Sequence, residues 1–92
     1  MNELAELWIE AIGLFAGMIG VIAWIPQIKE VWFAGKHEGI SLPTFGLIAT
    51  ALSAWLIYGV LIRSLSIILA NLAALGCISL IILGVIRLRG HD

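Results

Sequence analysis

Three long apolar segments are the feature of this sequence that most restricts its fold. They cover roughly residues 7–34, 43–62 and 66–86, and each is long enough to cross a bilayer, which takes about 20 helical residues. The chain has 92 residues, of which 62% are hydrophobic and 12% charged, and a chain of this size cannot bury so much apolar surface in an aqueous core. The sequence therefore predicts one all-α membrane domain, a bundle of three transmembrane helices.

Local signals mark both connections between these segments. Residues 35–42 are polar and contain two glycines, which predicts a loop. Pro43 stands where a proline is tolerated in the first helical turn, with Ser41 or Leu42 near the N-cap. Only residues 63–66 separate the second and third segments, so these two helices should be antiparallel neighbours, and a serine of this link can cap the third helix.

The basic residues predict the orientation of the chain in the membrane. With three spans, Arg63 falls on one side, and the other four basic residues fall on the opposite side: Lys29, Lys36, Arg87 and Arg89. The positive-inside rule then places the N-terminus outside and the C-terminus in the cytoplasm. The first residues are acidic, whereas a signal peptide begins with basic residues, so we expect the first segment to be retained.

Tryptophans and small residues indicate how the first segment is placed. Trp8 and Trp32 flank it, about 36 Å apart at 1.5 Å per residue, which matches the separation of the two headgroup regions and predicts two interface anchors. Gly13 and Gly17 lie one helical turn apart and predict a face where another helix approaches closely.

Pro26 and Gln27 interrupt the first apolar segment. Proline removes one backbone hydrogen bond and clashes with the preceding turn, but a helix in lipid can continue if neighbouring groups satisfy the freed carbonyl. A kinked helix with an uncharged polar residue beside the kink is typical of a hinge. A static bend is the alternative interpretation.

Trp55 and Asn71 are the candidate substrate-binding residues. Counting along their helices places them about 12 and 9 Å from the 63–66 link, and therefore in one layer. Tyr58 lies on nearly the same face as Trp55, nearer the outside. An indole, a carboxamide and a phenol suit a neutral solute rich in hydroxyl groups. The alternatives are an interhelical hydrogen bond for Asn71 and a packing or interface role for Trp55.

Other functional classes lack their usual residues in this sequence. No acid or base lies deep in any segment, which disfavours a proton relay or an ion-coupled carrier and favours a facilitator. His37 and His91 stand in a loop and a tail without partners at metal-ligand spacing, and we expect both to be solvated. Cys77 is expected to be a packing residue. We expect no enzymatic activity, no cofactor, no metal and no nucleic-acid partner.

Three helices are too few to enclose a polar route. A second copy, related by a two-fold axis along the membrane normal, makes six helices and places two copies of Trp55 and Asn71 about that axis. Pro26 then lies on the cytoplasmic side of this layer. The predicted assembly is a parallel homodimer in a lipid bilayer.

Four motifs, in this order and spacing, resemble the SemiSWEET family, the bacterial half-size relatives of SWEET sugar transporters in the PQ-loop group. They are Pro26–Gln27, Ile40–Ser41, Trp55–Gly59 and Ile67–Asn71. The resemblance implies a parallel homodimer of three-helix bundles in the bacterial inner membrane, with the sugar route on the dimer axis. It also implies that Trp55 and Asn71 contact sugar, that Pro26–Gln27 is the hinge motif and that Tyr58 belongs to the outer gate.

One departure from the family pattern concerns the outer gate. Family members often carry an arginine and an aspartate in the short outer link. Here Arg63 is present, but Ser64 and Ser66 stand where an acid and a proline are common. Hydrogen bonds from Tyr58 and the serines, or a looser gate, are therefore expected in place of an ionic outer gate.

Three functions are consistent with these observations. The first is facilitated diffusion of a monosaccharide or disaccharide, of the glucose or sucrose class, by alternating access in a homodimer that rocks about Pro26. The second keeps this architecture but carries amino acids or another small solute. The third is a small non-transporting membrane adaptor subunit, in which every polar residue is an interhelical contact.

Overall fold

The computed structural model describes residues 3–90, and within them the chain forms three helices. They are α1 (Glu3–Trp32), α2 (Leu42–Leu61) and α3 (Leu65–Arg89). All three are long and apolar enough to cross a membrane. The first begins earlier than predicted, with acids in its first turn, and the third extends to Arg89, with basic residues in its last turn. Both charge patterns interact favourably with the dipole of their helix. His91 lies outside the described residues.

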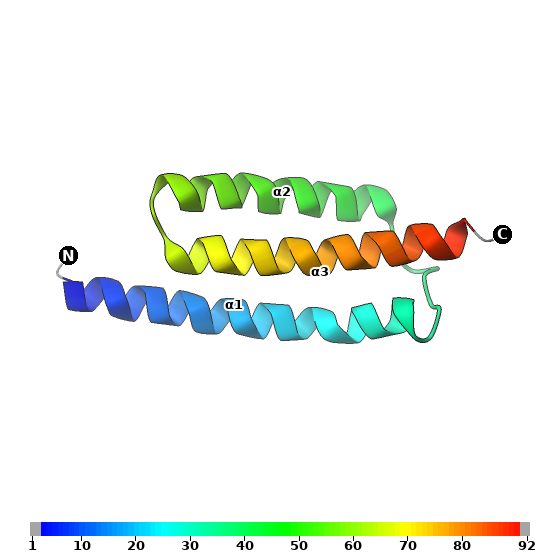
Figure 1. The fold of residues 1–92 in the computed structure, drawn as a ribbon, viewed down its shortest axis with the longest axis horizontal. Helices are drawn as coiled ribbons and strands as arrows, with labels where there is room; N and C mark the ends of the chain where they lie inside the picture. The colour runs from blue at the N-terminus through cyan, green and yellow to red at the C-terminus, as the bar shows by residue number, and fades with distance from the viewer. Residues whose placement is uncertain (1–2, 91–92) are drawn as a thin grey trace.

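The three helices form a single layer in which α3 lies between α1 and α2 (Figure 1). The extents of the chain are 57 × 22 × 14 Å, and the shortest is little more than the diameter of one helix, about 10–12 Å. The start of α1 and the α2–α3 link lie at one end, and the α1–α2 loop and the end of α3 lie at the other (Figure 1). One layer has no second wall, so a polar route along it needs another molecule to close it.

Serines begin both later helices. The Ser41 hydroxyl accepts a hydrogen bond from the Thr44 N–H at 3.3 Å, and a proline occupies the first turn of α2, as predicted. The Ser64 hydroxyl accepts from the Ile67 N–H at 3.3 Å and caps α3. Each hydroxyl satisfies a backbone donor that has no partner within its helix.

The α2–α3 link is a tight, fully hydrogen-bonded corner. Arg63 has a φ of 58°, in the left-handed region. Its N–H donates to the Val60 carbonyl at 3.2 Å, and the Ser64 N–H donates to the Gly59 carbonyl at 2.9 Å. This is the Schellman pattern, in which glycine usually occupies the left-handed position. Because these bonds fix the corner, the ends of α2 and α3 at this link are held in one arrangement.

Small residues let α1 approach α3 closely near the α2–α3 link. A Cβ atom added at Gly13 would lie 2.5 Å from the Ser66 hydroxyl oxygen, and one added at Gly17 would lie 2.8 Å from the Ala70 Cβ. Such distances leave no room for a side chain on α1. The predicted close helix contact at Gly13 and Gly17 is therefore confirmed, and α3 is the helix that approaches.

The buried apolar core lies at the opposite end. Its members are Val31, Ile40, Ile81 and Val85. The Trp24 ring packs against this cluster and meets the Phe45 ring edge-to-face, with centroids 6.0 Å apart. Residues from α1, α2, α3 and the α1–α2 loop thus meet at this end.

Trp32 has a role that its prediction as an interface anchor did not include. Its indole N–H donates to the Leu80 carbonyl of α3 at 2.9 Å, and the Arg87 guanidinium lies 4.8 Å from its ring centroid. Both contacts join α1 to α3. Trp8, by contrast, is 65% exposed, as expected for an anchor in contact with headgroups.

His37 is not the solvated residue that the sequence predicted. Its side chain is 21% exposed, and its Nδ1 accepts a hydrogen bond from Arg89 Nε at 3.1 Å. The same guanidinium donates to the carbonyls of His37 and Ile40 at 3.0 and 2.7 Å. Arg89, at the end of α3, therefore fixes the α1–α2 loop. The pKa of the adjacent Glu38 carboxyl lies below its usual value, mainly because its own backbone N–H bonds to it.

Candidate functional site

A hollow of about 420 Å³ brings together residues from all three helices, and we call it the central groove. Its volume falls within the range of small-molecule sites, about 300–1,000 Å³. On the α1 side the lining residues are small, which leaves space in front of α2 and α3. The groove is lined by Gly13, Ala16, Gly17, Trp55, Ser66, Ile67, Ala70 and Asn71. The two predicted substrate-binding residues, one from α2 and one from α3, thus lie on the same hollow.

Trp55 presents much of its indole ring to the surface. It is 55% exposed, and Tyr58, one turn away, is 48% exposed. Their rings meet edge-to-face, with centroids 5.4 Å apart and planes at 87°. This contact fixes the two aromatic side chains relative to each other while leaving a flat apolar surface accessible.

Asn71 is half-buried and bonds within its own helix. Its Nδ2 donates to the Ile67 carbonyl at 2.8 Å. Among residues 3–90, neither its side-chain carbonyl oxygen nor its second amide hydrogen has a protein partner. The alternative in which Asn71 joins two helices is therefore not what this protomer shows, and a donor and an acceptor remain for a ligand.

A larger hollow continues from the central groove toward the α2–α3 link, and we call it the outer hollow. Its volume is about 570 Å³. It shares Gly13, Ser66 and Ile67 with the central groove. The remaining lining residues are Glu6, Ile9, Glu10, Ile62, Arg63 and Ser64. The two hollows therefore adjoin at these three residues, between the α2–α3 link and the layer of Trp55 and Asn71.

Glu10 is the polar contact at this end that sequence reasoning missed. One carboxylate oxygen accepts from the Ser64 hydroxyl at 2.8 Å, and the other accepts from the Ser66 N–H at 2.7 Å. The two serine hydroxyls lie 3.3 Å apart. In sequence Glu10 reads as one of several acids near a helix end. The sequence feature that could have indicated this contact was Gly13, which follows Glu10 by about one turn and allows the close approach to α3.

This contact corrects the expectation for the two link serines. Ser64 and Ser66 were expected to supply hydrogen bonds for an outer gate. Both are buried, and within the same protomer the Ser64 hydroxyl and the Ser66 N–H already donate to Glu10. Arg63 remains exposed on the outer hollow. Of the predicted gate residues, Tyr58 and Arg63 are thus the two whose side chains are accessible at this end.

Pro26 and Gln27 lie away from the central groove. The α1 helix continues through Pro26 to Trp32, as predicted for a proline in a membrane helix. Gln27 donates weakly to the Glu30 carboxylate, at 3.5 Å. Neither residue lines the central groove, so any part they play in transport concerns the shape of α1 and not solute contact.

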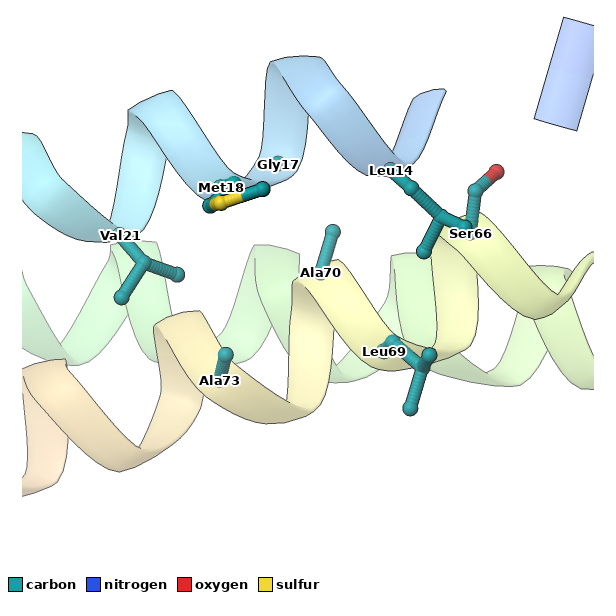
Figure 2. Close-up of a pocket in the computed structure, with 8 residues that line it drawn as sticks. All are labelled: Leu14, Gly17, Met18, Val21, Ser66, Leu69, Ala70 and Ala73. Carbon is teal, nitrogen blue, oxygen red and sulfur yellow. The ribbon is translucent and has the colours of Figure 1, made fainter. Parts of the chain in front are cut away.

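A third hollow, of about 240 Å³, lies between α1 and α3 (Figure 2). The large apolar side chains that line it are Leu14, Met18, Val21 and Leu69. In this view α2 lies behind α3, so the hollow opens on the face away from α2 (Figure 2). Ser66 is the one polar side chain that lines it. This surface suits lipid chains and offers little to a hydroxyl-rich solute.

Comparisons with known proteins agree with this architecture. The family model for the PQ loop repeat matches residues 8–68. A curated relative from Escherichia coli, described as the sugar transporter SemiSWEET, is 29% identical over 63 residues, which are 68% of this chain and 71% of the relative. A crystal structure of a bacterial homologue of SWEET transporters superposes with a TM-score of 0.82 and 39% identity, covering 86% of this chain and 95% of that one.

Fold and groove together define a small multi-pass membrane protein with one layer of three helices and an uncharged groove, which contains Trp55 and Asn71, on one face. The chain belongs to the PQ-loop repeat family and, within it, to the SemiSWEET family. The predicted three-helix membrane fold is confirmed.

Proposed function

We propose that this protein is a sugar transporter, which moves a monosaccharide or disaccharide by facilitated diffusion along the axis of a parallel homodimer. The observation that carries the proposal is the central groove, where Trp55 and Asn71 lie on one accessible surface. The relatives named as a sugar transporter and as a SWEET homologue support it.

The chemistry of the central groove matches a sugar. A pyranose ring has an apolar face that packs on an indole, as Trp55 offers, and hydroxyls that pair with both the donor and the acceptor of a carboxamide, as Asn71 offers. None of the described lining residues of the central groove is ionisable. Binding therefore requires no protonation step, which supports uniport over proton coupling.

A second copy is the proposed wall of the route. Because the protomer is a single layer, the central groove is open along its length. The same face carries exposed aromatic rings at Trp55 and Tyr58. A two-fold axis along the membrane normal would place two such faces opposite each other and bury these rings.

Orientation and gating follow from the charges at the two ends. We place the end with Arg63 outside and the end with the α1–α2 loop in the cytoplasm of a bacterial inner membrane, because the remaining basic residues gather there. Arg63, exposed on the outer hollow, and Tyr58, exposed beside Trp55, are the proposed outer gate. The Pro26–Gln27 segment is the proposed hinge.

Replacing Pro26 by alanine should slow transport without weakening sugar binding. Alanine restores the backbone N–H that proline lacks, so α1 gains a hydrogen bond and becomes stiffer. We expect the maximal uptake rate to fall on the order of tenfold, about 1.4 kcal/mol in the barrier, while the half-saturating sugar concentration stays nearly unchanged. Pro43→Ala is the matched control, because a first-turn N–H has no partner within its helix. Equal rates for the two variants would show that Pro26 is a static bend.

Uptake of labelled glucose and sucrose into liposomes that contain the purified protein tests the proposal. We expect saturable uptake of at least one sugar, with the same rate in the presence and absence of a pH gradient. Acceleration by a pH gradient would contradict uniport. If a correctly assembled dimer moves neither sugar, the cargo is wrong and amino acids are tested next. A dimer that moves none of these solutes would favour the adaptor.

A further inference from the structure

The strongest polar contact between α1 and the rest of the protomer lies at the outer end. Both oxygens of Glu10 are engaged, at 2.8 Å to the Ser64 hydroxyl and 2.7 Å to the Ser66 N–H. The Ser66 N–H is among the first-turn donors of α3, which have no partner within the helix. A carboxylate is the preferred acceptor there, because the helix dipole favours negative charge at an N-terminus.

The partners of Glu10 belong to the most constrained corner of the chain. Ser64 is both the N-cap of α3 and the last residue of the hydrogen-bonded turn that ends α2. One turn along α1, Gly13 packs against Ser66 so closely that a Cβ would not fit. Glu10 therefore contacts the hydrogen-bonded corner that joins α2 to α3.

On the basis of the proposed function, we propose that Glu10 is a positioning residue for the outer side of the transport route. It holds α1 to the corner between α2 and α3, so that the outer halves of the three helices move as one unit. The outer side then opens and closes by movement between the two protomers. Glu10 acts through Ser64 and Ser66, because it lines the outer hollow and not the central groove.

The location of Arg63 explains why the hydrogen bonds of Glu10 to Ser64 and Ser66 matter for gating. Arg63 directly precedes Ser64 and has a left-handed backbone, so its side chain is presented by the corner that Glu10 holds. Without Glu10, α1 loses its hydrogen bonds to this corner and keeps the packing of Gly13 and Gly17 against α3. The rest of the protomer stays folded, because the apolar core lies at the opposite end. The outer gate would then lose its fixed position relative to α1.

The distance between α1 and α2 within one protomer tests whether Glu10 holds α1 to the α2–α3 corner, and this measurement needs no substrate. Spin labels are placed on cysteines at Leu7 and Leu61, which are 67% and 75% exposed at the outer ends of α1 and α2. Cys77 is replaced by alanine, and labelled protein is diluted with unlabelled protein so that only distances within one protomer are measured. We expect one narrow distance distribution for the parent protein and, for Glu10→Ala, a distribution about twice as wide or split in two.

Matched variants distinguish the loss of the Glu10 hydrogen bonds from the loss of a negative charge. Glu6→Ala removes another acid of the outer hollow and should leave the distribution narrow. Glu10→Gln can keep its oxygen on the Ser66 N–H and its amide on the Ser64 hydroxyl, so it should restore most of the parent behaviour. If Glu10→Ala fails to assemble, Glu10→Asp takes its place, since its carboxylate is one methylene too short for these partners.

Transport supplies the second readout. For Glu10→Ala we expect the maximal rate of uptake to fall on the order of tenfold, with the half-saturating sugar concentration changed less than about twofold, because Trp55 and Asn71 are untouched. The same narrow distribution and the same rate for Glu10→Ala and Glu6→Ala would overturn the proposal. If the parent protein moves no sugar, the proposed function fails, while the distance measurement still decides whether Glu10 ties the helices.

Discussion

Replacing Asn71 by alanine is expected to abolish saturable sugar uptake, with a loss of at least about 100-fold in the ratio of maximal rate to half-saturating concentration, or about 2.7 kcal/mol. The Asn71 amide offers the central groove both a donor and an acceptor, whereas the Ser66 hydroxyl that also lines it is buried beside the Ser64 hydroxyl. Without the amide, sugar hydroxyls that leave water lose this donor and this acceptor. The measurement is concentration-dependent uptake into liposomes, with Ser79→Ala on the same helix as the control.

Trp55→Ala should cause a loss of similar size for a different reason. The indole supplies the flat apolar surface on which a sugar ring packs, and alanine leaves the groove without it. Trp8→Ala is the matched control, because Trp8 is also exposed but lies near the end of α1. The amount of dimer is measured in parallel by cross-linking. Loss of dimer in step with loss of uptake would contradict a binding role and favour the adaptor, in which both residues only hold helices together.

The predictions from sequence succeeded where the structure depends on neighbouring residues or on a distance counted along one helix. Ser41 and Pro43 begin α2 as expected, because capping depends on neighbouring residues alone. Trp55 and Asn71 reach the same groove because helices rise by a fixed length per residue, so counting from a short link gives their depths. Their role in binding sugar stays a prediction.

What could not be predicted depends on which helix faces meet. Glu10 lies 54 positions from Ser64 in the chain, and no pattern along the sequence pairs them. The same is true of Arg89 and His37, which lie 52 positions apart. Glu10 contacts an unpaired backbone N–H at the start of α3, and Arg89 contacts carbonyls of the α1–α2 loop. Sequence reasoning identifies such ends but not the side chain from another helix that reaches them.

Gly84→Ala should destabilise the folded protein by about 3 kcal/mol, a larger cost than most single substitutions cause. A Cβ at this position would lie 2.6 Å from Val31 Cγ1 and 2.8 Å from Trp32 Nε1. Neither neighbour can yield cheaply. Val31 is fully buried, and movement of the Trp32 ring would break its hydrogen bond to the Leu80 carbonyl.

Gly76→Ala, also within α3, is the matched control, because a Cβ there meets no atom within 4 Å. It should be neutral or stabilising by up to about 1 kcal/mol, the intrinsic helical preference of alanine over glycine. Both variants are unfolded with SDS in mixed micelles and followed by circular dichroism. Equal midpoints would show that α1 and α3 separate easily at the end that holds the apolar core. A lower midpoint for Gly84→Ala alone would show that this end is a packed unit.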